Sequence, residues 1–139
     1  MSRPIWTDKY TGWIWHLRGR VAPQVDCWGF IAEILNTEYG AKVPDYSEFE
    51  IIPDDEFQKV MARPNPPFIK LDGEKPQEGD LIVLDGSSAS IHVGVMLNRR
   101  EFVHLERDRE SRVDRVEDPW WKSKVIAFYR ARKEADDTA

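Results

Sequence analysis

The spacing of hydrophobic positions changes along the chain and divides it into a helical first part and a β-rich second part. After Asp26, apolar residues recur every three to four positions, while Glu33 falls on the opposite, polar side, which is typical of an amphipathic helix. We predict this helix over residues 26–38, with Asp26 as its N-cap and Gly40 just past its end. A second, shorter helix is predicted from about Asp54 to Ala62.

From residue 69 onward the pattern becomes short apolar runs separated by turn residues, which predicts β-strands. The predicted strands are Leu81–Leu84, Ile91–Leu97, Glu101–Leu105, Arg112–Val116 and Val125–Arg130. Helices followed by strands indicate an α+β domain, in which N-terminal helices pack on a small antiparallel sheet of about five strands.

The remaining segments show no regular pattern. Residues 1–25 are expected to be irregular apart from one short helix near Lys9–Leu17. The segment RPNPPF at 63–68 is expected to be a loop, because proline disfavours regular elements. The tail from about residue 132 is expected to fray. A length of 139 residues then corresponds to a single domain over 1–139.

Composition and charge narrow the function classes. A net charge of −5 argues against binding nucleic acid by bulk electrostatics, and the arginines of residues 99–118 are interleaved with acids. No apolar stretch is long enough for membrane insertion, and the start lacks the apolar core of a signal peptide. A single cysteine excludes an internal disulfide and a cysteine-rich zinc site. No metal-ligand spacing and no phosphate loop is visible, so no metal and no cofactor is expected.

Cys27 is the first candidate for chemistry, because it falls in the first turn of the predicted helix. Backbone N–H groups and the helix dipole stabilise a thiolate there, and such positions bring a thiol pKa from ~8.5 down toward ~3.5–7.5. A cysteine of that kind is a nucleophile at neutral pH. The alternative interpretation is a small hydrophobic side chain in the core.

The second candidate is a pair of histidines, His92 and His104, on neighbouring predicted strands. A three-residue loop at Asn98–Arg100 pairs Gly94 with His104 and places both histidines on one face as diagonal neighbours. A two-residue loop would place His104 on the opposite face. Two ordinary strand histidines are the alternative interpretation.

These three residues together suit a cysteine hydrolase. The Cys27 thiolate would attack a carbonyl, His92 would act as base and acid, and His104 would orient His92. We assign the base to His92 because it precedes Gly94, whose missing side chain leaves room beside the nucleophile. Backbone N–H groups at the start of the helix would contribute to an oxyanion hole. Asp80 is a rival orienter, although Gly-Asp before a strand commonly marks a turn.

Three ordered segments, DCWGF, EGDLIVL and HVGVMLNRREFVH, resemble the signature segments of the NlpC-type cell-wall peptidases, a papain-like group. The resemblance spans about residues 12–130. It implies a papain-like domain with Cys27 as nucleophile, His92 as base and His104 as the third residue. It also implies that the substrate is the peptide stem of peptidoglycan, cut at an amide such as that between D-glutamate and diaminopimelate.

Other segments resemble one branch of that family. The Trp after Cys27, the string VPDY and the closing DPWWKSKVIAFYR look like tail-tip proteins of bacteriophages and gene-transfer particles. The resemblance implies tail-tip or baseplate proteins as partners and association with a virion tail. A cell-wall enzyme made in the cytoplasm without a signal peptide would reach its substrate through lysis, a holin-type exit or delivery on a particle.

The sequence also departs from the family pattern. The family places a Tyr about twelve residues before the Cys, and Trp15 stands at that position here, without a hydroxyl. Ser90 lies one position further back than the Ser that often precedes the base His. Asp26 matches an acidic residue that can receive a substrate amine, and a plain N-cap is an equal alternative. We therefore expect Asp26, Trp15 and Ser90 to contact substrate, with His16 and Trp120–Trp121 as weaker candidates better explained by packing or surface roles.

The leading hypothesis is a peptidoglycan-stem amidase or endopeptidase with a Cys-His-His mechanism. A structural tail-tip component with the same fold and little or no hydrolase activity is the alternative, and the departure at Trp15 motivates it. An acyltransferase using the same thiolate chemistry, and a cytoplasmic peptidase acting on muropeptides, remain open interpretations.

Overall fold

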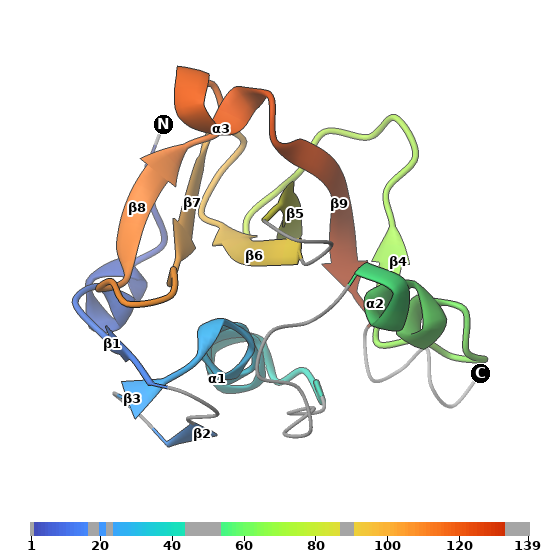
Figure 1. The fold of residues 1–139 in the computed structure, drawn as a ribbon, viewed down its shortest axis with the longest axis horizontal. Helices are drawn as coiled ribbons and strands as arrows, with labels where there is room; N and C mark the ends of the chain where they lie inside the picture. Colours follow the sequence, from blue (N-terminus) through green and yellow to red (C-terminus); the bar gives the residue numbers. More distant parts are fainter. Residues whose placement is uncertain (1, 17–19, 22–23, 44–53, 87–90, 133–139) are drawn as a thin grey trace.

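A six-stranded antiparallel sheet forms the centre of the molecule, with its strands in the order β4-β9-β5-β6-β7-β8 (Figure 1). The structure, a computed structural model, describes residues 2–16, 20–21, 24–43, 54–86 and 91–132. The strands are β4 (Phe68–Lys70), β5 (Leu81–Asp85), β6 (Ile91–Met96), β7 (Glu101–His104), β8 (Arg112–Arg115) and β9 (Val125–Ala131). This arrangement confirms the predicted α+β class, with six strands where about five were expected.

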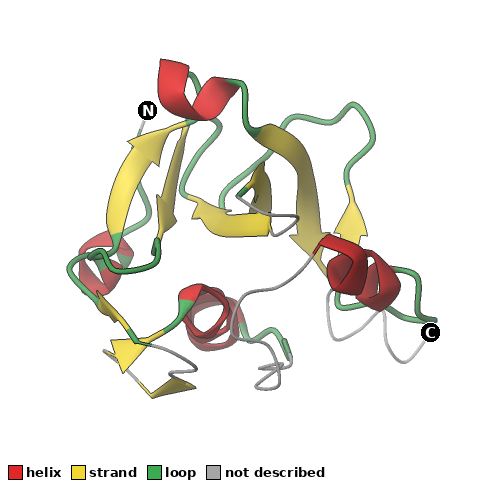
Figure 2. Ribbon diagram, in the orientation of Figure 1, coloured by secondary structure: helices red, strands yellow, loops and turns green. Residues whose placement is uncertain are grey.

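Helices lie on both sides of this sheet (Figure 2). The helices are α1 (Cys27–Tyr39), α2 (Asp54–Met61) and α3 (Pro119–Lys122), preceded by the 3-10 helix η1 (Thr7–Tyr10). Three two-residue strands, β1 (Ile14–Trp15), β2 (Arg20–Val21) and β3 (Gln24–Val25), form a small second sheet in the order β1-β3-β2. Within the described ranges, no helix has the length and apolar character needed to cross a membrane.

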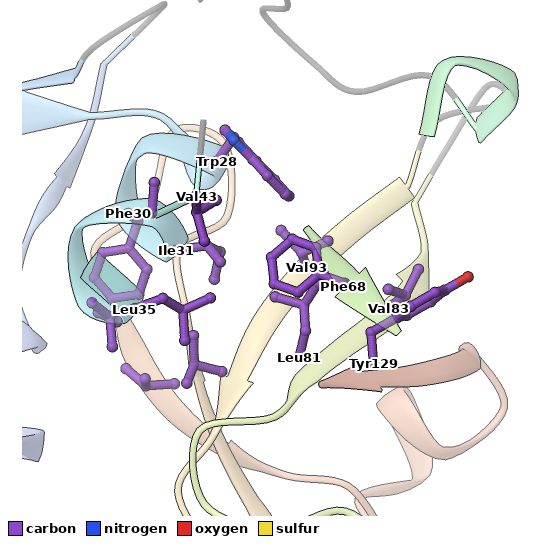
Figure 3. Close-up of a cluster of buried hydrophobic side chains, with 14 of the residues drawn as sticks. Trp28, Phe30, Ile31, Leu35, Val43, Phe68, Leu81, Val83, Val93 and Tyr129 are labelled. Carbon is purple, nitrogen blue, oxygen red and sulfur yellow. The ribbon is translucent and has the colours of Figure 1, made fainter. Parts of the chain in front are cut away.

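Helix α1 forms where the spacing of apolar residues predicted it, and it packs on one face of the sheet. Its apolar side meets alternate residues of β5, β6 and β7, and Figure 3 shows Phe30, Ile31 and Leu35 in the same cluster as Leu81 and Val93. The Asp26 carboxylate accepts a hydrogen bond from the Gly29 N–H at 2.7 Å, which confirms the predicted N-cap. Gly40 ends the helix in the left-handed region at φ 63°, as predicted.

The turn between β6 and β7 fixes the register of the two strands. The side chain of Asn98 accepts hydrogen bonds from the N–H groups of Arg100 and Glu101, at 2.8 and 2.9 Å. Leu97 N–H then donates to the Glu101 carbonyl, and Gly94 stands opposite His104. Of the two loop lengths considered from the sequence, the structure therefore has the three-residue loop.

Two local predictions were wrong. The helix expected near Lys9–Leu17 is instead η1 followed by β1, because Gly12 takes a φ of 81° and the next residues bond to another segment. Trp15 N–H donates to the Arg109 carbonyl, and Ser111 N–H donates to the Trp13 carbonyl. Strand β4 begins at Phe68, the last residue of the segment expected to be a loop.

Helix α3 was not predicted. It begins after Asp118, whose side chain accepts from the Trp120 N–H at 2.8 Å, with Pro119 at its first position. The acidic connection before residue 54 and the tail beyond residue 132 lie outside the described residues.

Candidate active site

The two histidines singled out in the sequence are in contact. His92 Nε2 lies 2.7 Å from His104 Nδ1, so one ring donates a hydrogen bond to the other. His104 has no exposed surface, whereas His92 is partly exposed. Strands β6 and β7 therefore present an accessible imidazole backed by a fully buried one.

A carboxylate continues this row on the next strand. His104 Nε2 lies 2.7 Å from Asp114 Oδ2, and Asp114 belongs to β8. The Arg112 Nε donates to the same carboxylate oxygen at 3.0 Å, and the Arg112 guanidinium also pairs with Glu106. Three neighbouring strands thus supply a continuous hydrogen-bonded row, His92–His104–Asp114.

Burial and charge keep both rings neutral at pH 7. Burial, together with the neighbouring His104 and the positive charge of Arg112, lowers the pKa of His92 to about 3. Burial also lowers the pKa of His104, although its hydrogen bond to Asp114 opposes that effect. Partial burial alone would raise the pKa of Asp114, but the hydrogen bond from His104 and the charge of Arg112 outweigh it and lower that pKa. At neutral pH the row therefore contains two neutral imidazoles and one carboxylate.

Trp121 of α3 covers the two rings. Its indole stacks on His92 at 5.9 Å between centroids with an interplanar angle of 22°, and it meets His104 edge-on at 5.0 Å. Trp121 is 5% exposed, and the neighbouring Trp120 is 64% exposed. This contact confirms the packing interpretation for Trp121, whose ring covers one side of the histidine pair.

Cys27 is the first residue of α1 and is partly exposed, so it is not a fully buried core cysteine. Asp26, directly before it, has no exposed surface and caps the helix. The N–H groups of Gly29 and Phe30 both bond to Asp26, to its side chain and its carbonyl respectively. Those two donors are thereby unavailable to a substrate oxygen.

The histidines and α1 pack on different faces of β6. Ile91, Val93 and Val95 face the core that α1 covers, and side chains alternate along a strand. His92 consequently points to the face that carries Trp121. The structure brings His92 and His104 together, and the approach of the Cys27 thiol to His92 stays a prediction.

The remaining predicted residues are placed as follows. Trp15, in β1, is partly buried, and the Arg107 guanidinium lies 5.2 Å from the centroid of its ring. His16 is exposed, and Ser90 lies outside the described residues. Asp80 is 2% exposed and pairs through both carboxylate oxygens with Arg130, at 2.9 Å each. The rival orienter therefore joins β9 to the turn before β5, which agrees with the turn interpretation.

Sequence reasoning missed Asp114. The residue lies in a predicted strand among charged neighbours, which looked like a solvated hairpin surface. The usable signal was strand alternation, since the pairing of His104 with Arg112 puts residues 112 and 114 on the histidine face. Among the described residues, no cluster of three or more His, Cys, Asp or Glu side chains is arranged to hold a metal ion.

The fold with this row of side chains is that of a papain-like α+β domain. The model of the NlpC/P60 family matches residues 12–130, and the chain therefore belongs to the NlpC/P60 family.

Curated relatives and solved structures agree with this assignment. Murein DD-endopeptidase MepS/murein LD-carboxypeptidase of Escherichia coli K12 is 25% identical over 120 residues, covering 84% of this chain and 56% of the relative. The chain thus spans about half the length of the curated relatives it matches. The same relative from Escherichia coli O157:H7 matches equally.

Two solved structures show the likeness of fold. A lipoprotein-like NLP/P60 family protein from Staphylococcus aureus has a TM-score of 0.66 at 20% identity, over 91% of this chain and 39% of that one. The NlpC/p60 domain of the peptidoglycan hydrolase SagA has a TM-score of 0.57 at 17% identity, over 90% of this chain and 92% of that one.

Proposed function

We propose that this protein is a cysteine peptidase that hydrolyses an amide bond in the peptide stems of peptidoglycan. The observation that carries the proposal is the hydrogen-bonded pair His92–His104, 2.7 Å apart, on the sheet of an NlpC/P60 domain whose single cysteine begins a helix. The matched curated relative is a murein endopeptidase and carboxypeptidase, which supports cell-wall peptides as the substrate class.

The chemistry follows from the atoms that are already engaged. His92 uses Nε2 toward His104, which leaves Nδ1 to meet the thiol. In the first step Cys27 Sγ bonds to the substrate carbonyl carbon, and its proton passes to His92. His92 then gives that proton to the leaving amine as the C–N bond breaks. Water next hydrolyses the thioester with His92 as base, and this step restores the thiol.

The mechanism needs His92 neutral before the reaction and charged within it. Its pKa of about 3 keeps the ring a proton acceptor at neutral pH. The imidazolium that forms is compensated through His104 by the carboxylate of Asp114. His104 in this proposal orients His92, as the third member of the Cys27–His92–His104 set.

The substrate contacts extend this proposal. We assign Asp26, Trp15 and Ser90 to the substrate side, and the amide between D-glutamate and diaminopimelate to the cleaved bond. Asp26 caps α1 with no exposed surface, so a substrate amine would have to displace the side chains that cover it. Trp15 offers an apolar ring beside Arg107 and no hydroxyl.

Digestion of purified peptidoglycan tests the function. The wild-type protein is expected to release muropeptides, and mass spectrometry of the products identifies the bond. Cys27→Ala and His92→Ala are each expected to abolish release while circular dichroism stays unchanged. Turnover retained in Cys27→Ala would refute the assignment of Cys27 as the nucleophile.

Alkylation tests the thiol–imidazole pairing directly. Iodoacetamide is expected to label native Cys27 rapidly near pH 7, because a neutral His92 beside the thiol would accept its proton as the sulfur attacks the reagent. His92→Ala is expected to slow that labelling at least about tenfold, whereas substitution of the exposed His16 by Ala leaves it unchanged. Equal rates in all three proteins would show that the two groups do not meet.

We also propose that the peptidase acts as part of a phage-type tail or gene-transfer particle, with tail-tip or baseplate proteins as partners. Only the likeness of the Trp after Cys27, of the string VPDY and of the closing segment DPWWKSKVIAFYR to that branch supports this placement. Mass spectrometry of purified particles from producing cells tests it. Particles that contain the protein and assemble normally with Cys27→Ser, yet no longer digest cell wall, would separate catalysis from a scaffold role.

A further inference from the structure

A third strand continues the histidine row beyond the residues that the proposed mechanism uses. Asp114 of β8 meets His104 at 2.7 Å, on the side of the ring opposite His92. It lies on the same face of the sheet as both histidines, because β7 and β8 pair Phe102 with Asp114 and His104 with Arg112. The two strands thereby present the carboxylate to His104 Nε2.

The donor and acceptor roles along this row can be assigned one residue at a time, starting from Asp114. Asp114 is ionised and can only accept, so His104 Nε2 must carry a proton. A neutral His104 then has an unprotonated Nδ1, which can only accept. His92 Nε2 must therefore donate to it, and the neutral His92 is left with an unprotonated Nδ1.

We propose that Asp114 is a positioning residue that fixes the tautomers of both histidines and so makes His92 Nδ1 the basic atom. The carboxylate acts through His104 and does not touch the reacting atoms. The catalytic meaning of this inference rests on the proposed function, whereas the tautomers themselves do not.

The surroundings hold Asp114 in this role. Arg112 donates at 3.0 Å to Asp114 Oδ2, the same oxygen that meets His104, and is itself paired with Glu106. The Asp114 side chain is 23% exposed and His104 is fully buried, so water competes poorly for the hydrogen bond between them. Trp121 packs against both rings.

Removal of the carboxylate would break this logic, whereas an amide can preserve it. Asn keeps one accepting oxygen. Arg112 Nε and His104 Nε2 both meet the same oxygen, Asp114 Oδ2, so an amide oxygen at that position can accept from both. Ala has no acceptor. His104 Nε2 would then lose its partner, His104 would be free to adopt the Nδ1–H tautomer, and His92 would carry its proton on Nδ1, the atom assigned to the thiol.

Nitrogen-15 NMR of the wild-type protein is the first test, because imidazole ¹⁵N shifts distinguish the two tautomers. The chain has only three histidines, and exposed His16 provides an internal reference. At pH 7 we expect the Nε2–H tautomer at both His92 and His104. An Nδ1–H tautomer at either position would overturn the proposal, and this measurement needs no variant.

Asp114→Ala is the second test, with Asp114→Asn as the conservative variant and Asp108→Ala as the matched control for charge. Asp108 has an 81% exposed side chain, and its substitution makes the same change of charge. We expect Asp114→Ala to move both histidines toward Nδ1–H and to lower kcat about 10–100-fold with little change in KM. Asp114→Asn should keep the Nε2–H tautomers, and Asp108→Ala should change neither measurement.

The outcomes separate this inference from the proposed function. Wild-type tautomers and wild-type kcat in Asp114→Ala would overturn the positioning role. Cell-wall turnover that survives in Cys27→Ala would refute the proposed function, while the NMR spectra would still decide the tautomers. If Asp114→Ala does not fold, the wild-type spectrum alone decides.

Discussion

Gly94 stands opposite His104 in the β6–β7 pair, and its missing side chain sets how closely the two strands' histidines approach. A Cβ built at this position would lie 2.9 Å from Phe102 Cδ2, 3.1 Å from the Val103 carbonyl oxygen and 3.2 Å from His104 Cβ. Because one of these atoms belongs to the backbone, a side-chain rotation cannot relieve the crowding. The residue therefore makes room beside His104 on β7, whereas the sequence suggested that it makes room beside the nucleophile.

Gly94→Ala is accordingly expected to lower the free energy of unfolding by about 1–3 kcal/mol, the usual cost of overpacking. It should also lower cell-wall turnover, because β7 must shift and lengthen the 2.7 Å contact between the histidines. Urea denaturation and product release measure the two effects.

The matched control is Gly73→Ala. Gly73 has a φ of 77° and open space where the methyl group of an alanine would lie, so its cost is the left-handed backbone alone, about 1–2 kcal/mol. That variant should lose stability and keep its turnover. A Gly94 variant with undiminished turnover would contradict the close-approach explanation.

At the level of single residues, the sequence predicted what depends on local spacing. Loop length alone placed His92 and His104 on one face, since strand alternation is strict. The sequence could not predict that Asp114 and Trp121 contact the histidine pair. Those contacts depend on the register of β8 and on the position of α3. Ten and seventeen residues separate His104 from Asp114 and Trp121, too far for a local pattern.

Among the elements, α1 combines a cap and the proposed nucleophile in adjacent positions. Asp26 bonds the Gly29 N–H at 2.7 Å, and Cys27 follows as the first helical residue. The cap and the assigned substrate contact make different demands on Asp26, because a cap needs one acceptor atom and an amine needs a negative charge.

Two substitutions separate these demands. Asp26→Ala is expected to lower the free energy of unfolding by about 0.5–2 kcal/mol through loss of the cap, while Asp26→Asn should retain most of the stability. If Asp26 also receives a substrate amine, Asp26→Asn will raise KM despite its wild-type stability. An unchanged KM in that variant would leave the cap as its whole role.

Elements with strong periodic patterns were the ones that the sequence located well. Helix α1 and strands β5 to β9 match their predicted positions to within one or two residues. The segment near Lys9–Leu17 failed because its hydrogen bonds go to Arg109 and Ser111, about a hundred positions away. Strand β4 was missed because three residues carry almost no pattern, and pairing with β9 is what makes them a strand.

For the molecule as a whole, the buried histidines couple folding to pH. In the unfolded chain a histidine titrates near 6.5, whereas the folded pKa of His92 is about 3 and that of His104 is also lowered. Below pH 6.5 the unfolded state therefore binds protons that the folded state refuses. The contribution of these two histidines to the free energy of unfolding is fully present above pH 6.5 and is lost as the pH falls below it.

We expect the free energy of unfolding to fall between pH 6.5 and 5, by up to about 1.4 kcal/mol per pH unit for each histidine. Urea denaturation at several pH values measures the slope. The carboxylates with lowered pKa values, Glu101 and Asp114, lose their contribution only at lower pH, where an unfolded carboxyl begins to protonate. His92→Gln should reduce the slope, and an unchanged slope would place the titration elsewhere.

Strand β8 is an edge strand of the six-stranded sheet, because it has a neighbour on only one side in the sheet order. An edge strand can pair with a strand of a second molecule, and the charged residues of β8, Arg112, Asp114 and Arg115, disfavour such pairing. The side chains that secure the histidines consequently also deter edge-to-edge aggregation. Replacing these charged residues with alanine is therefore expected to favour edge-to-edge association and, at Asp114, to remove the hydrogen-bond partner of His104.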